Sequence, residues 1–123
     1  MDISEVREYC LSLPFTSEDM PFGDDIVTLR VGGKIFAMLN LMDTSRVSLK
    51  CDPDYAEELR ERYDNIRPAW HMNKRHWNDV GLGADAVPTL LLRSLIRHSY
   101  NCVVRGLPRA LRDTIPALSE AED

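Results

Sequence analysis

The sequence lacks the short patterns that identify most enzymes and cofactor-binding proteins. It contains no GxSxG turn, no P-loop and no GxGxxG fingerprint. The pair Gly32-Gly33 does not replace a phosphate-binding loop, because no helical pattern follows it. We therefore expect a protein that has no catalytic activity and uses no cofactor.

Paired cysteines and long apolar runs are also missing. Cys10, Cys51 and Cys102 are odd in number and far apart, which is typical of reduced thiols. No apolar run approaches the roughly 20 residues that a membrane helix needs, and the acidic N-terminus lacks the apolar core of a signal peptide. We expect a single-domain cytoplasmic monomer that has no membrane association.

Charge is unevenly distributed along the chain, although the formal net charge is −5. Residues 1–64 hold fourteen acidic and seven basic residues, and residues 65–112 hold eight basic residues against two acidic ones. The last eleven residues add four acidic residues and no basic one. This separation favours one anion-facing surface on an acidic molecule, although the two halves could also pair with each other in the fold.

The segment Trp70–Asn78 is the densest group of chemically active side chains. It holds two Trp, two His, two Asn, a Lys and an Arg, and only Met72 is purely apolar. One interpretation is a packed turn with its rings in the core, and the other is a binding surface with rings for stacking and cations for phosphate or carboxylate. The spacing of His71, His76 and Asp79 does not predict a metal site, because a loop would have to bring the three groups together.

Hydrophobic periodicity and turn residues predict the order of elements in the first half of the chain. Asp2 and Glu5 form the pattern of a capping box that opens a helix ending before Pro14. A loop with an anchored Phe22 ring should follow over residues 16–25. Three strands come next, with turns at residues 32–33 and 43–45; their ranges are 26–31, 34–41 and 46–51.

The second half continues with a helix, two strands and a long helix. Asp52-Pro53 should cap the first helix, and short strands are expected at 66–70 and 77–82. The last helix should span about Pro88 to Arg105 and present Arg93, Arg97 and Arg105 as one stripe. Together these elements predict a two-layer α+β domain, in which an antiparallel sheet of about five strands has helices packed on one face.

The domain should cover residues 1–112 and be followed by an acidic tail, residues 113–123, that we expect to be disordered. This tail could compete with nucleic acid for a basic surface. The Arg93, Arg97 and Arg105 stripe has no acidic neighbour on its own helix. The sequence leaves open whether this stripe binds a partner or is simply an exposed helix face.

Several segments resemble the MmcQ/YjbR family in matching order. They are Glu8–Pro14, Pro21–Gly23, Val31–Ala37, Leu49–Pro53, His71–Lys74 with His76-Trp77, and His98–Tyr100. The resemblance implies a frataxin-like α+β fold and the double-wing arrangement proposed for DNA binding, and it does not imply catalysis. Our leading expectation is therefore a DNA-binding protein with a regulatory role. The Arg-rich last helix and the acidic tail depart from the family pattern.

Two binding hypotheses follow. In the first, the protein binds duplex DNA through residues of the third strand and of the Trp70 segment, which are Arg46, Lys50, Trp70, His71, Asn73, Lys74, Arg75, His76 and Trp77. In the second, a small anion or a protein partner binds in a cleft near Pro21, Phe22 and residues 71–77. Exposure of the two Trp side chains should discriminate between these hypotheses, because buried rings cannot stack on bases.

Overall fold

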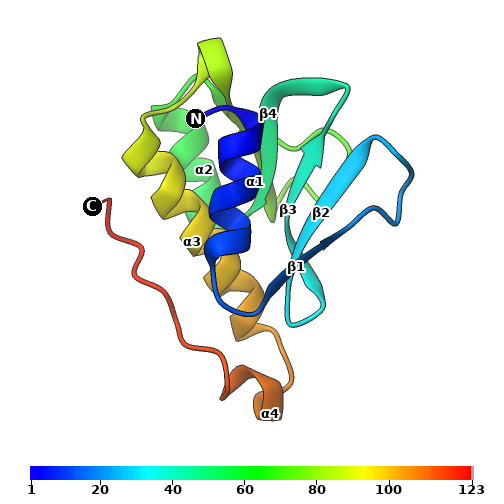
Figure 1. Cartoon of the computed structure of the whole chain (residues 1–123). Helices are drawn as coiled ribbons and strands as arrows, with labels where there is room; N and C mark the ends of the chain where they lie inside the picture. Colours follow the sequence, from blue (N-terminus) through cyan, green and yellow to red (C-terminus); the bar gives the residue numbers. More distant parts are fainter. Residues whose placement is uncertain (123) are drawn as a thin grey trace.

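A computed structural model of the chain describes residues 1–122, with helices on one side of an antiparallel sheet (Figure 1). The elements are α1 Ile3–Ser12, β1 Thr16–Asp19, β2 Ile26–Val31, β3 Lys34–Asn40, β4 Asp43–Lys50, α2 Pro53–Arg62, β5 Ile66–Pro68, β6 Trp77–Gly81, a 3-10 turn Gly83–Asp85, α3 Thr89–Arg105 and α4 Arg109–Arg112. The six strands lie in the order β1-β2-β3-β4-β6-β5, so β1 and β5 form the edges. The predicted α+β architecture is confirmed. No helix within residues 1–122 has the length and apolarity needed to cross a bilayer.

Local signals in the sequence explain the starts of both early helices. The Asp2 carboxylate accepts from the Glu5 amide at 2.9 Å, and the Glu5 carboxylate accepts from the Asp2 amide at 3.1 Å. This reciprocal pair satisfies two amides that a helix N-terminus leaves free. Asp52 caps α2 in a similar way by accepting from the Tyr55 amide, and Pro53 occupies the first helical position.

The β2–β3 hairpin and β4 fix which side chains face the helices. Gly32 and Gly33 have φ of 57° and 82°, the left-handed values that a tight two-residue hairpin turn requires. Leu29, Ala37 and Leu49 are aligned across three strands and are buried beneath the helices. Leu49 therefore lies on the inward face of β4, within the strand predicted at residues 46–51.

The structure corrects two details of the prediction. Residues 16–19, expected to be loop, form the edge strand β1 paired with β2; the polar stretch Thr-Ser-Glu-Asp carries no apolar alternation by which a strand could be recognised. The turn expected at residues 43–45 lies instead at residues 41–42, because the Asn40 side chain accepts from the Met42 amide at 2.9 Å and turns the chain earlier.

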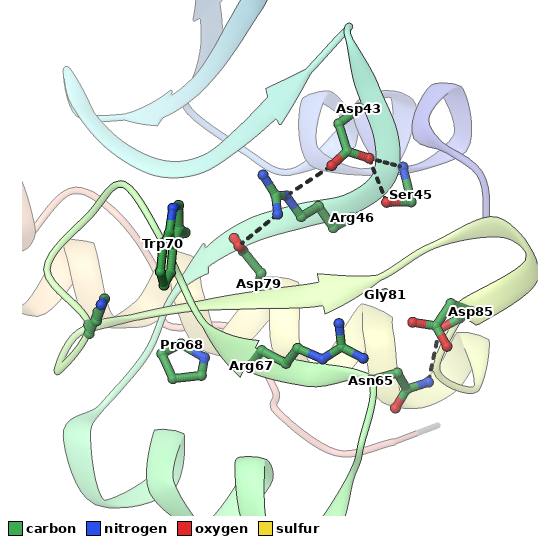
Figure 2. A pocket seen from close by; sticks show the side chains of 11 residues that line it. Asp43, Ser45, Arg46, Asn65, Arg67, Pro68, Trp70, Asp79, Gly81 and Asp85 are labelled. Atoms are coloured by element: carbon green, nitrogen blue, oxygen red, sulfur yellow. Dashed lines mark hydrogen bonds and ion pairs between the residues drawn. The ribbon is translucent and has the colours of Figure 1, made fainter.

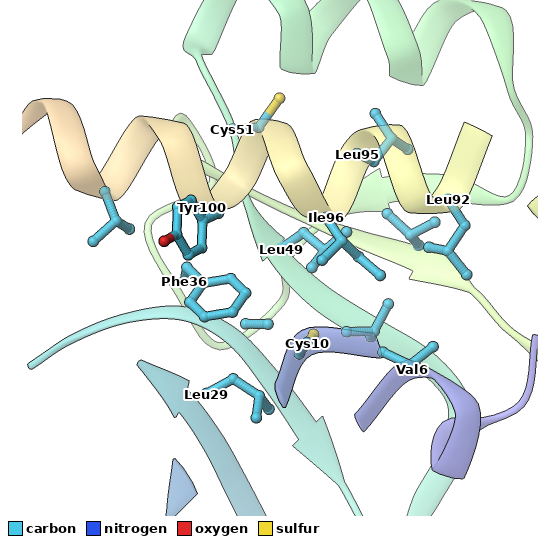
Figure 3. Packing of buried hydrophobic residues seen from close by; sticks show 14 of the residues in the cluster. Val6, Cys10, Leu29, Phe36, Leu49, Cys51, Leu92, Leu95, Ile96 and Tyr100 are labelled. Atoms are coloured by element: carbon cyan, nitrogen blue, oxygen red, sulfur yellow. The ribbon is translucent and has the colours of Figure 1, made fainter. Parts of the chain in front are cut away.

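The core lies between the sheet and the helices α1 and α3 (Figure 3). Tyr100 is fully buried, and its ring meets the Phe36 ring edge-on with centroids 5.7 Å apart. The Tyr100 hydroxyl donates to the Pro14 carbonyl at 2.5 Å, and Ser99 donates to the Phe36 carbonyl. These bonds join α3 to β3 and to the end of α1, so the helical layer has one defined position on the sheet.

The C-terminal segment, residues 113–122, lies along α3 (Figure 1), although we expected disorder there. The Asn101 side chain donates to the Leu118 carbonyl at 2.8 Å and accepts from the Leu118 amide at 2.9 Å. Arg97 donates to the carbonyls of Ser119 and Ala121 at 2.6 Å and 2.5 Å. The acidic composition of the segment did not reveal these partners. Asp123, the last residue of the predicted tail, lies outside the described residues.

This arrangement also changes the interpretation of the arginine stripe. Arg105 lies 3.4 Å from the Glu120 carboxylate, and the Arg93 guanidinium lies 5.4 Å from the centre of the Tyr9 ring. The stripe therefore contacts other parts of its own chain. The C-terminal segment occupies the helical side of the molecule, away from the open face of the sheet, so it does not cover that face.

The three thiols are free, as predicted. Cys10 and Cys51 are buried, and burial raises the pKa of each thiol to about 12. Cys102 is partly exposed, and burial raises its pKa as well. The buried thiols are therefore protonated and unreactive at neutral pH.

Candidate nucleic-acid interface

The face of the sheet that the helices leave open carries polar side chains in register. Ser48 of β4 lies opposite Asp79 of β6, and Asp79 lies opposite Arg67 of β5. This alternation between an apolar inner face and a polar outer face is the pattern expected of a half-covered antiparallel sheet. The open face is consequently the place where strand residues can meet a ligand.

The loop over residues 69–76, here called the Trp70 loop, connects β5 to β6 beside this face. Ala69 donates to the Trp77 carbonyl at 3.0 Å and closes its base. Asn73 accepts the Arg75 amide at 3.0 Å through its side chain and the His76 amide at 3.1 Å through its carbonyl. The loop is thus an ordered turn rather than slack chain.

Arg60 of α2 fixes this loop from the helical layer. Its Nε donates to the Asn78 side chain at 2.6 Å, and its terminal nitrogen donates to the carbonyls of Lys74 and, at 3.3 Å, Trp77. In the sequence Arg60 lies within the charged run Glu57–Arg62, which is typical of a solvated helix face. Its anchoring role was missed because the partners are distant in sequence and mostly backbone atoms.

Trp70 and Lys74 are both exposed on this loop. The Trp70 side chain is 70% exposed, and the Lys74 ammonium lies 4.7 Å from the centre of its ring. This distance is within the range of a cation–π contact, which holds the ammonium over the ring face. An exposed aromatic ring with an adjoining cation can stack on a base and meet its phosphate.

An ion-pair network lies next to Trp70 on the open face of the sheet. The Arg46 guanidinium is 3.5 Å from the Asp43 carboxylate and 3.6 Å from the Asp79 carboxylate. Ser48 donates to Asp79 at 2.6 Å. Hydrogen bonds from the Ser45 hydroxyl and amide, with the charge of Arg46, hold the pKa of Asp43 below its ordinary value. The Asp43 carboxylate therefore stays charged at neutral pH, and together with Asp79 it orients Arg46.

A cavity of about 580 Å³ opens between this network and the Trp70 loop (Figure 2). Three basic side chains, Arg46, Arg67 and Lys74, lie on its wall together with Trp70. Its remaining lining is mainly acidic and polar: Asp43, Ser45, Asn65, Pro68, Asp79, Gly81 and Asp85. Its size lies within the roughly 300–1,000 Å³ typical of ligand sites.

A smaller hollow of about 80 Å³ shares Arg46, Trp70 and Asp79 with this cavity. Ile26 and Asn40 line this hollow from β2 and β3, and His71 and Met72 line it from the Trp70 loop. The open face is thus hollowed on both sides of Trp70, between the Trp70 loop and the ends of β2 and β3.

The structure brings together some of the residues predicted from sequence and separates others. Arg46, Trp70 and Lys74 meet at the large cavity, and His71 lies at the small hollow. Asn73 and Arg75 are exposed on the Trp70 loop. Trp77 is only 8% exposed, so it offers no stacking surface. Lys50 and His76 line a different hollow, next to the start of α2.

Pro21 and Phe22 do not line the two hollows of the open face. They form a turn in which the Gly23 amide donates to the Met20 carbonyl at 3.4 Å. The Phe22 ring is 63% exposed, so the expectation that it is anchored was wrong. Nothing in the neighbouring sequence supplies the apolar partner that would bury it.

Sequence reasoning missed Arg67, Asp43 and Asp85 as cavity residues. Arg67 could have been noticed as a base on the wet side of a predicted strand, but the β5–β6 pairing that places it opposite Asp79 is not visible locally. The predicted absence of a metal site remains a prediction; within residues 1–122 no three His, Cys, Asp or Glu side chains come together as metal ligands.

The fold and this face define a class of protein: a two-layer α+β domain in which the uncovered face of an antiparallel sheet is polar and carries an exposed aromatic ring. The family model YjbR matches residues 11–102. The chain therefore belongs to the YjbR family, in agreement with the resemblance seen in its motifs.

Relatives and solved structures support this assignment. The chain is 38% identical to "Uncharacterized protein YbdF" of Escherichia coli O157:H7, over 84% of both chains. It is 32% identical to "Uncharacterized protein YjbR" of Escherichia coli K12, over 96% of this chain and all of that protein. The crystal structure of Deinococcus radiodurans protein DR2400, which has a DUF419 domain, matches with a TM-score of 0.87 at 34% identity, covering 98% of this chain and 94% of that one. A Pseudomonas syringae protein matches with a TM-score of 0.67 at 25% identity, over 80% and 96%.

Proposed function

We propose that this protein is a non-catalytic, cytoplasmic DNA-binding module of regulatory type that uses the open face of its sheet. The observation that carries the proposal is the 70% exposure of Trp70 with the Lys74 ammonium 4.7 Å from its ring centre. A ring that can stack on a base and a cation that can contact its phosphate are thereby present on one loop.

Two projections flank the small hollow and fit the double-wing arrangement. One is the Trp70 loop, and the other combines the β1–β2 loop with the β3–β4 turn, joined where Leu41 donates to the Asp25 carbonyl at 2.8 Å. Met42 is 77% exposed at the tip of this second projection. Apolar tips of this kind can insert between base steps, while Arg46 lies between the projections as part of the lining of the small hollow.

Electrostatics should make this binding weak. The molecule carries a net charge of −5, and Arg46 is already paired with two carboxylates. Lys74 and Arg75 carry no ion pair within residues 1–122, so they can neutralise phosphates. Each phosphate contact adds about −0.9 to the slope of log K against log salt for duplex DNA.

The test is a fluorescence-anisotropy titration of random-sequence duplex and single-stranded oligonucleotides over a salt series. The variant Lys74→Ala/Arg75→Ala should flatten the slope by about 2. Trp70→Ala should weaken single-strand binding by about 1–3 kcal/mol, the usual contribution of one stacked base. Arg109→Ala/Arg112→Ala on α4 removes the same charge elsewhere and should have little effect. Absence of binding at low salt, or equal losses in both charge variants, would refute the proposal.

The cavity itself supports a second candidate function, the binding of a small anionic ligand between Trp70, Arg67 and Lys74. Its volume of about 580 Å³ suits a ligand of nucleotide size. Competition separates the two functions. A mononucleotide that binds when oligonucleotides of ten or more residues do not would favour the small ligand.

A further inference from the structure

Three segments with motif-like sequences meet away from the open face. They are the end of β4 with the start of α2, the residues before β6, and the C-terminal half of α3. Cys51 donates its amide to the His76 carbonyl at 2.8 Å, and Asp52 donates its amide to His98 Nε2 at 3.1 Å. Cys102 lies one helical turn after His98, with its sulfur 3.3 Å from Nε2. The junction is therefore held rigidly by hydrogen bonds between segments.

Two hollows of about 410 Å³ and 330 Å³ adjoin at this junction and share Lys50 and Cys102. We refer to them together as the basic hollow. Four cationic side chains line it, and the single carboxylate there is Asp52; the cations are Arg30, Lys34, Lys50 and Arg105. The His76 ring also lines the hollow.

The cations of the basic hollow are only partly neutralised. Arg30 is paired with Asp19 at 3.0 Å, and Arg105 lies 3.4 Å from Glu120. In the described part of the chain Lys34 and Lys50 carry no ion pair. Like charges gathered around a concave surface raise the local positive potential and attract anions.

The groups beside the hollow already bind one anion. The Glu120 carboxylate lies 2.7 Å from His98 Nδ1 and 2.9 Å from the Asn101 side-chain nitrogen, in addition to its contact with Arg105. Glu120 therefore pairs with Arg105 and not with Lys34 or Lys50 of the hollow.

We propose that the basic hollow is a second binding site, which takes a compact multivalent phosphate, namely a diphosphate group. Lys34 and Lys50 approach it from the strand ends and Arg105 from α3, so oxygens on both phosphorus atoms can be contacted at once. This site is separate from the proposed DNA-binding face, because neither Trp70 nor Lys74 lines it.

Cys102 provides a local reporter for this site, since it is the partly exposed thiol while Cys10 and Cys51 are buried. We would measure its alkylation by iodoacetamide in the full chain at low salt, with increasing pyrophosphate. Saturable protection of Cys102 is expected, with weaker protection by inorganic phosphate. Cys102→Ser should abolish the labelling and so confirm which thiol reports.

Charge variants identify the groups involved. Lys50→Ala should weaken pyrophosphate binding by about tenfold, the loss expected for one charged hydrogen bond. Lys74→Ala/Arg75→Ala is the matched control and should leave protection unchanged. If the control abolishes protection, or if no saturable protection occurs up to millimolar pyrophosphate, the proposal is overturned. If Lys50→Ala weakens DNA binding as much as pyrophosphate binding, the hollow is part of one nucleic-acid surface and the proposal is likewise wrong.

The source of the diphosphate is decided by a further titration. Adenosine diphosphate that protects Cys102 at lower concentration than pyrophosphate would identify a nucleotide ligand, and equal concentrations would identify the inorganic group. Either result supports the site. If the Trp70 and Lys74 variants do not change the affinity for DNA, the proposed function is refuted and this inference is left intact.

Discussion

Replacing Arg60 with Ala should detach the Trp70 loop from the helical layer. Arg60 makes three hydrogen bonds to the β6 strand and its preceding loop, through Asn78, Lys74 and Trp77. A hydrogen bond to a charged group contributes about 1.5–3 kcal/mol, and bonds that share one guanidinium are not additive. Asn78 is only 1% exposed, so its side-chain oxygen would be left buried without the hydrogen bond from Arg60. We expect a loss of about 2–4 kcal/mol in the free energy of unfolding.

Urea unfolding followed by circular dichroism measures this loss. Arg62→Ala is the matched control, because its side chain is 64% exposed and forms an exposed ion pair with Glu58 at 3.7 Å. Such exposed pairs contribute about 0–1 kcal/mol. In a Trp70→Phe background, acrylamide quenching of Trp77 should also increase when Arg60 is removed, since that ring is normally buried. Equal stability of the Arg60 and Arg62 variants would refute the anchoring role.

Three further outcomes follow from burial and charge. Leu49→Ala should cost about 2–5 kcal/mol and Thr44→Ala, on the same strand, at most about 0.5 kcal/mol; equal costs in thermal unfolding would contradict the strand register. Although burial raises it, hydrogen bonds from Asn101 and His98 leave the pKa of Glu120 below its ordinary value of 4.5. The stabilising contribution of the Glu120 carboxylate is thus complete above pH 4.5 and is lost as the pH falls through the lowered pKa. Amide hydrogen exchange at Leu118 should therefore become faster in that acidic range. The acceleration should be smaller in Glu120→Gln. Melting temperature should be the same with and without reductant; a drop on reduction would disprove free thiols.

Local signals predicted most of the fold because they are strong at the helix starts and at the Gly32-Gly33 turn. The capping box of Asp2 and Glu5 and the alternation of residues 46–51 each specify a conformation within a few residues. The edge strand Thr16–Asp19 was missed because its partner, β2, supplies the reason for its conformation.

The candidate site was predictable only in part. The Trp70 segment is recognisable from composition, but which of its two rings is exposed depends on the pairing of Trp77 with Lys50 across β6 and β4. The binding of the C-terminal segment depends on Asn101 and Arg97, which a composition-based reading treats as solvated. Contacts between residues distant in sequence decide both cases.

The edges of the sheet limit how molecules of this protein can meet. β1 has four residues and carries Glu18 and Asp19, and β5 has three residues and ends at Pro68, which has no amide hydrogen. Short, charged or proline-terminated edges oppose the addition of a strand from another molecule. The sheet therefore resists growth into ribbons at high concentration, and any partner must be recognised through side chains and not by strand addition.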